Sequence, residues 1–156
     1  MYSNKKVYTL VFLRKGKQVL LGMKKRGFGE GKWNGFGGKV ETGETFAEGA
    51  AREVKEECGL DVDSEELEET AVIEFEFKGD PVKLEMHVFQ TRNFSNEIIE
   101  SEEMRPEWFE EEFVPFDTMW VDAKHWYHHM FANKRFTAYF LLDGYDKILQ
   151  ETIVFQ

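Results

Sequence analysis

Apolar and polar positions alternate with a period of two along most of this chain, and that pattern predicts a protein built largely from β-strands. We expect strands at 7–13, 18–23, 72–77, 84–91, 107–109, 136–142 and 148–155. Turn residues separate three pairs of them, at 14–17, 78–81 and 143–146. The segment 27–38 is rich in glycine, so we expect a loop there with a short strand near its end.

The period changes to that of a helix after residue 45. One helical stripe holds the apolar residues Phe46, Ala50, Val54 and Cys58. Thr45 followed by Glu48 is a capping-box pattern, and Gly59 is a natural stop, so we expect a helix over 45–57. A second helix is predicted over 122–133. Strands mixed with two helices predict a layered α/β sandwich.

Composition and charge narrow the function. The 156 residues fit one domain, 1–156, with no linker or repeat. Lys and Arg total 20 against 30 Asp and Glu, a net charge of −10, which disfavours binding of a nucleic acid polymer. The one cysteine fits a reducing compartment, and no apolar run would span a bilayer. We therefore expect a soluble cytoplasmic monomer without membrane contact, with a mitochondrial or nuclear share left open.

Three carboxylates carry the candidate chemistry. On the predicted helix Glu53, Glu56 and Glu57 are spaced i, i+3 and i+4, so they share one face and repel one another. A hard cation such as Mg²⁺ would offset that repulsion. We expect Arg52 to point elsewhere and clamp Glu44. A run of Glu is ordinarily a solvated helix face, but the flanking glycines, arginine and glutamate all in register argue against that alternative.

The spacing of these residues, over 38–44 and 52–60, has the form G-x5-E-x7-R-E-U-x-E-E-x-G-U, where U is aliphatic. It resembles the complete signature of the Nudix family. The resemblance implies an α/β/α Nudix sandwich with a mixed β-sheet. It also implies an acid anhydride hydrolase of a nucleoside diphosphate linked to another group. Mg²⁺ is the implied cofactor, with Mn²⁺ able to substitute.

Outside the signature, nearly the whole chain resembles the eukaryotic MutT-homologue family of oxidised purine nucleoside triphosphate hydrolases. The densest stretches are 8–11, 19–29, 33–40, 86–89, 103–106 and 119–120. The resemblance implies hydrolysis of 8-oxo-dGTP and 2-hydroxy-dATP, at the β phosphorus by family analogy, to the monophosphate and pyrophosphate. This reaction would sanitise the nucleotide pool and prevent misincorporation into DNA.

Matching positions assign roles by the same resemblance. Asn34 reads the purine edge, Asp122 is the acidic reader and Trp120 stacks on the base. The remaining substrate-binding residues are Thr9 at the pocket floor, Phe28 and Phe75 as walls, Lys24 toward the ribose or phosphates, and Gly37 with Gly38. The metal site takes Glu53, Glu56, Glu57, Glu103 and Gly38.

Each of these residues has an ordinary structural alternative. Asn34 among glycines is commonly a turn residue. The aromatic residues are more often core, Asp122 before a helix is by default an N-cap, and Lys24 sits at a solvated strand end. Glu103 is equally well a solvated loop charge.

One position departs from the family pattern, because Ala123 follows Asp122 where a second Asp is usual in vertebrate members. A carboxyl pair can share protons and so bond either a keto or an amino group. We therefore expect a narrower or shifted preference among oxidised guanine, oxidised adenine and O6-methylated guanine nucleotides. The alternatives are another Nudix substrate (a methylated nucleotide, a diphosphoinositide, ADP-ribose or capped RNA) and a nucleotide-binding module without turnover.

Overall fold

The computed structural model describes residues 5–156, and its main feature is an eight-stranded sheet. The strands are β1 (Lys5–Lys15), β2 (Gln18–Lys24), β3 (Trp33–Asn34), β4 (Glu68–Phe77), β5 (Lys83–Thr91), β6 (Met104–Glu110), β7 (Phe136–Asp143) and β8 (Lys147–Phe155). Seven of them follow the order β3-β2-β1-β5-β4-β7-β8, and β6 pairs with β2. The pairs β1–β5 and β4–β7 are parallel and the others antiparallel, so the sheet is mixed.

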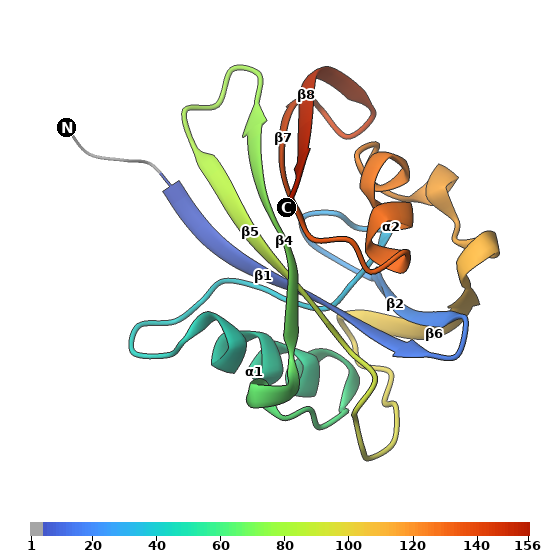
Figure 1. The fold of residues 1–156 in the computed structure, drawn as a ribbon. Helices are drawn as coiled ribbons and strands as arrows, with labels where there is room; N and C mark the ends of the chain where they lie inside the picture. The colour runs from blue at the N-terminus through green and yellow to red at the C-terminus, as the bar shows by residue number, and fades with distance from the viewer. Residues whose placement is uncertain (1–4) are drawn as a thin grey trace.

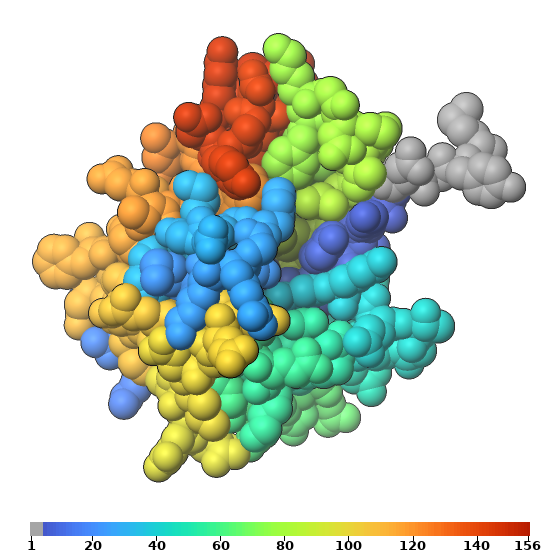
Figure 2. All heavy atoms as spheres, turned by 180° about the vertical axis from the view of Figure 1, so that it is seen from behind, coloured from blue at the N-terminus to red at the C-terminus, as the bar shows by residue number. Residues whose placement is uncertain are grey.

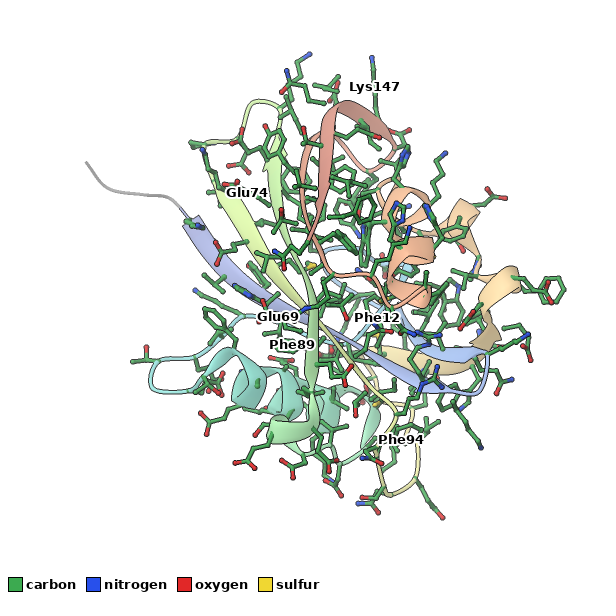
Figure 3. All side chains as sticks on the ribbon, in the orientation of Figure 1. Phe12, Glu69, Glu74, Phe89, Phe94 and Lys147 are labelled. Carbon is green, nitrogen blue, oxygen red and sulfur yellow. The ribbon has the colours of Figure 1, made fainter. Side chains whose placement is uncertain are left out.

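Both faces of the sheet are buried, and β1 shows this most clearly. Leu10 and Phe12 belong to one apolar cluster, while Val11 and Leu13 belong to the other. Successive strand residues point to opposite faces, so one strand supplies both cores. Phe12 and Phe89 mark the two sides of the sheet in Figure 3.

One helix covers each face (Figure 1). The helix α1 (Phe46–Cys58) buries Ala50, Val54 and Cys58 in one cluster, and α2 (Ala123–Phe131) buries Trp126, Tyr127 and Met130 in the other. Three short 3₁₀ turns complete the chain, η1 (Ser64–Glu66), η2 (Glu111–Phe113) and η3 (Phe116–Thr118). The α/β/α sandwich with a mixed sheet is confirmed.

The ends of α1 follow the sequence signals. Thr45 accepts from the backbone N of Glu48 at 3.1 Å, and the Glu48 side chain accepts from the backbone N of Thr45 at 2.8 Å. Gly59 takes a left-handed conformation, φ 80°, and ends the helix. The helix therefore runs one residue later than predicted, because Thr45 is its cap and Cys58 is its last residue.

Strands extend further than the alternation predicts, because hydrogen bonding to neighbouring strands continues beyond the apolar positions. The predicted turn at 14–17 is wrong at its start, because the buried Arg14 stays in β1 and bonds Gln90 and Glu111. β6 includes Pro106, which an outer strand tolerates. The helix predicted to Asn133 ends at Phe131 instead. Among residues 5–156, no helix is long and apolar enough to cross a membrane.

Candidate functional site

A cavity of about 220 Å³ opens on the α2 side of the sheet. All nine residues predicted to bind substrate line it: Thr9, Lys24, Phe28, Asn34, Gly37, Gly38, Phe75, Trp120 and Asp122. Three segments distant in sequence gather beside it. In Figure 2 the blue segment around residues 25–32 stands between the red β7–β8 turn and the yellow loop before β6. The fold thus brings together, around one cavity, binding residues that lie far apart in the sequence.

Aromatic rings form one wall of this cavity. The Phe28 and Trp120 ring centroids are 5.1 Å apart, and Tyr145 lies edge-on to Trp120 at 4.7 Å. Phe28 is 68% exposed, which places it at the mouth, whereas Phe75 is buried and stacks on Phe140. The alternative of a core residue is therefore correct in part for Phe75, because its ring belongs to the core and also lines the cavity. Flat rings around an open space suit a planar base.

Asn34 presents an amide to the cavity and is held by two donors. Its Oδ1 accepts from the backbone N of Gly35 at 2.9 Å and from the hydroxyl of Tyr127 at 3.0 Å. A backbone N–H can only donate, so the oxygen must face it, and the amide nitrogen is left for a ligand. Asn34 sits in the short strand β3, so the turn alternative is wrong.

Asp122 is the buried acid of the cavity, at 5% exposed. Its Oδ2 accepts from Nε1 of Trp126 at 2.8 Å, and it makes no side-chain capping bond to α2. Asp122 does occupy the N-cap position of α2, but its side chain bonds the indole one turn on instead of capping the helix. Burial raises the pKa of Asp122 to about 6, although the indole bond opposes that shift. Both protonation states are accessible near neutral pH.

Sequence reasoning missed the two residues that hold these polar groups, Trp126 and Tyr127. The i, i+4 spacing from Asp122 to Trp126 was a usable signal, since such pairs meet on a helix. Nothing local links Tyr127 to Asn34, which lies 93 positions earlier. Further lining residues that were missed are Tyr8, Leu10, Gly22, Gly29, Trp33, Gly35, Phe77, Leu84, Met86, Met104, Met119 and Leu142.

Glu57 connects this cavity with the carboxylate face of α1. Its side chain lines the cavity, and its Oε1 accepts from the backbone N of Gly37 at 2.7 Å. Burial raises the pKa of Glu57 to about 7, and the charges of Glu53 and Glu103 add to the shift. A buried carboxyl among other carboxylates is stabilised in its charged form by a cation.

Arg52 organises the other carboxylates. It holds Glu44 with two bonds, Nε to Oε2 at 3.1 Å and Nη2 to Oε1 at 2.7 Å, and this pairing keeps the pKa of Glu44 below its usual value. The expectation that Arg52 points away from the carboxylate face is wrong. Its Nη1 also donates to Glu53 at 3.0 Å and to Glu56 at 3.3 Å, because its long side chain reaches both. Burial raises the pKa of Glu53, which Arg52 partly opposes.

Glu103 lies on the other side of the cavity mouth. Its carboxylate is 65% exposed and pairs with Arg26 at 3.1 Å, while its backbone oxygen accepts from the backbone N of Lys25. Lys25 in turn pairs with Glu100. The loop before β6 is thus joined by ion pairs to the end of β2, and Glu103 contributes charge to the carboxylate face without contacting it.

Gly37 and Gly38 bring the backbone close to β1 and α1. A Cβ on Gly37 would lie 1.9 Å from the backbone oxygen of Thr9, and one on Gly38 would lie 2.7 Å from the Glu53 carboxyl. Position 37 therefore requires glycine, because backbone blocks a side chain there, whereas a side chain at position 38 would displace the Glu53 carboxyl. The carbonyl oxygen of Gly38 accepts from the backbone N of Thr9 at 2.9 Å. This bond fixes the backbone segment that lies between the cavity and the carboxylates of α1.

The donor set fits a hard divalent cation by its chemistry, since it consists of carboxylate oxygens on one helix face. The side chains are not gathered around one point. Across 5–156 no three His, Cys, Asp or Glu groups stand in position to hold a metal ion together. Glu56 is turned to Arg52 and Glu57 to Gly37. Ligation by Glu53, Glu56 and Glu57 together would require Glu56 to turn from the arginine.

Comparison with known proteins agrees with this geometry. The NUDIX domain family matches residues 4–139. The oxidized purine nucleoside triphosphate hydrolases of Danio rerio and Mus musculus are 48% and 44% identical to the chain. The alignments cover 95% and 97% of this chain and 94% and 96% of theirs.

Among solved structures, a MutT protein from Bacillus halodurans has a TM-score of 0.83 at 24% identity, covering 95% of this chain and 97% of its own. A MutT NUDIX hydrolase from Burkholderia pseudomallei gives 0.65 at 23%, covering 71% and 87%. These two support the fold. With the family match and the two relatives, they show that this chain belongs to the Nudix hydrolase family.

Proposed function

We propose that this protein hydrolyses oxidised purine nucleoside triphosphates, of the 8-oxo-dGTP and 2-hydroxy-dATP type, to the monophosphate and pyrophosphate. The observation that carries the proposal is that Glu57 lies both in the lining of an aromatic cavity and on the carboxylate face of α1. A base in the cavity would therefore place its phosphates beside the carboxylates. The names of the two relatives support the choice of substrate.

In this proposal the cavity binds the base through stacking and edge recognition. Trp120 and Phe28 supply the ring faces, while Asn34 and Asp122 supply the polar groups. Stacking on an aromatic side chain is worth about 1–3 kcal/mol per base and does not select among bases. Selection therefore comes from the two polar residues. Lys24, at the cavity edge, offers a cation to the ribose or phosphates.

In the proposal Glu53, Glu56, Glu57, Glu103 and Gly38 would hold a divalent cation, and that cation would bind the phosphates. Mg²⁺, for which Mn²⁺ would substitute, would supply charge neutralisation and a more acidic bound water there. Arg52 orients both Glu44 and Glu53 and favours their ionised forms, which supports the helix face that carries the proposed ligands. Burial raises the pKa of Glu57 to about 7, and a bound cation would favour its ionised form.

Other Nudix substrates remain the alternatives to this proposal: an O6-methylated purine triphosphate, ADP-ribose, a diphosphoinositide or capped RNA. A nucleotide-binding module without turnover is the alternative of another class. One domain over 1–156, a monomeric state, a cytoplasmic location and no binding to nucleic acid polymers also stay predictions of the sequence. A substrate panel with Mg²⁺ separates the enzymatic alternatives.

The test is product analysis after incubation with 8-oxo-dGTP and Mg²⁺. The proposal expects 8-oxo-dGMP and pyrophosphate in equal amounts, with no turnover once the metal is chelated. Release of the diphosphate and inorganic phosphate would contradict the cleavage site. Tight binding with no product would favour the non-catalytic module.

A further inference from the structure

Tyr127 is a buried residue of α2 with a tightly held ring. The side chain is 1% exposed. Its ring centroid lies 5.1 Å from that of Phe12 and 4.5 Å from that of Trp126, and it packs edge-on against Phe116 and Phe131. Contacts on several sides leave the ring little freedom, so the position of its hydroxyl is fixed by the core.

The hydroxyl reaches a residue of the cavity. It lies 3.0 Å from Oδ1 of Asn34, which also accepts from the backbone N of Gly35 at 2.9 Å. Because the backbone N–H can only donate, the amide oxygen must point at it, and Tyr127 then donates to the same oxygen. Both lone pairs of that oxygen are used. Asn34 has only its amide N–H groups left to offer a ligand.

We propose that Tyr127 is a positioning residue which, by saturating the Asn34 oxygen, makes the cavity select purine bases with a carbonyl oxygen at the edge facing Asn34. The proposal rests on the proposed function, since it concerns which oxidised purine is taken. A base with a carbonyl there would accept from the Asn34 amide, and 8-oxoguanine could offer its 6-carbonyl. A base with an amino group there would place its N–H donors against the N–H donors of the Asn34 amide, and neither group would have a hydrogen-bond acceptor.

A phenylalanine at position 127 would keep the ring contacts and remove only the donor. One lone pair of Asn34 would then be free, and the amide would be held only by the backbone N of the next residue. The side chain could turn or accept from an amino group. Discrimination between the two kinds of base would therefore weaken, while the carboxylate face of α1 would be unchanged.

The experiment compares the full-length wild type, Tyr127→Phe and Tyr139→Phe on 8-oxo-dGTP and 8-oxo-dATP with Mg²⁺. Tyr139 is the matched control, because this residue of β7 pairs with Glu74 of β4 and is not among the residues that line the cavity. Loss of one hydrogen bond of ordinary strength corresponds to about 3- to 10-fold in binding. Tyr127→Phe should lower the kcat/KM ratio of the guanine to the adenine nucleotide by that factor. The change should lie in KM, with kcat within about twofold. Tyr139→Phe should leave the ratio as it is.

A second background shows whether Tyr127 acts through Asn34. In Asn34→Ala, adding Tyr127→Phe should change the ratio no further, because the group that it positions is gone. Calorimetric binding of 8-oxo-dGMP provides a readout independent of turnover, and it should weaken about 3- to 10-fold in Tyr127→Phe only. An unchanged ratio and unchanged binding in Tyr127→Phe would overturn the inference. A wild type that binds 8-oxo-dGMP but does not hydrolyse 8-oxo-dGTP would instead refute the proposed function, and the binding comparison would still decide the role of Tyr127.

Discussion

The indole of Trp126 donates from Nε1 to Oδ2 of Asp122 at 2.8 Å, one helical turn away and inside the candidate site. The bond holds a buried carboxyl at the cavity wall while leaving its other oxygen for a ligand. Because burial outweighs this bond, the pKa of Asp122 is raised from 3.8 to about 6. The acid is thus costly to ionise in the folded protein.

This cost should appear in the pH dependence of stability. The pKa of Asp122 is higher in the folded protein than its ordinary value, so the folded state binds the proton more tightly. The stability that the group contributes is complete below pH about 3.8 and is lost as the pH rises through about 6. Relative to Asp122→Asn, which does not titrate, the wild-type free energy of unfolding should fall by roughly 2–3 kcal/mol between pH 4 and 7. Urea unfolding at several pH values measures this, and parallel profiles for the two proteins would contradict it.

Glu56→Gln should lower kcat about 10²- to 10³-fold, because it removes a carboxylate from the proposed metal site. Raising the Mg²⁺ concentration should recover part of the loss. Glu66→Gln is the matched control, since that exposed glutamate lies in η1, away from the site, and activity should stay at the wild-type level. Near-normal turnover in Glu56→Gln at limiting Mg²⁺ would show that the metal ligands have been assigned wrongly.

Arg52→Lys should reduce activity about 10- to 100-fold although the charge is kept. Lysine cannot make the two parallel bonds by which Arg52 holds Glu44, nor reach Glu53 at the same time. Steady-state kinetics over a range of Mg²⁺ concentrations measures the loss, with the exposed Arg135→Lys as control. Equal kinetics for both variants would mean that the clamp has no catalytic role.

Ala123 occupies a buried place in the cavity lining directly after Asp122. Ala123→Asp should restore a carboxyl pair and shift the relative kcat/KM values for 8-oxo-dGTP, 2-hydroxy-dATP and O6-methyl-dGTP by several-fold, because paired carboxyls share a proton. Ala123→Asn controls for size without adding an acid. Unchanged ratios among the three substrates in Ala123→Asp would remove the hypothesis that the single acid narrows the preference.

Much of the fold could be predicted because its signals are local. The capping box at Thr45, the stop at Gly59 and the alternation along β1 each depend on neighbouring residues. The ends of the strands were less predictable, because hydrogen bonds to neighbouring strands continue beyond the apolar positions. Arg14 illustrates this, since its burial depends on Gln90, which lies 76 positions later.

The candidate site divides in the same way. The carboxylates of α1 follow from spacing on one helix, and the nine predicted binding residues follow from resemblance. The directions of the side chains cannot be predicted in this way, because Arg52 lies within reach of several acids and pairs with Glu44, Glu53 and Glu56 in the folded protein. The contact between Tyr127 and Asn34 was equally beyond local pattern, because it joins α2 to β3 across the cavity.

The central claim is tested most directly by measuring pyrophosphate release with Mg²⁺ from 8-oxo-dGTP and from dGTP side by side. Glu56→Gln provides the background rate. If the cavity selects oxidised purines, kcat/KM for 8-oxo-dGTP should exceed that for dGTP by at least tenfold, about 1.4 kcal/mol of differential transition-state binding. Equal rates for the two nucleotides would contradict the selection of oxidised purines, while leaving the membership of the Nudix family intact.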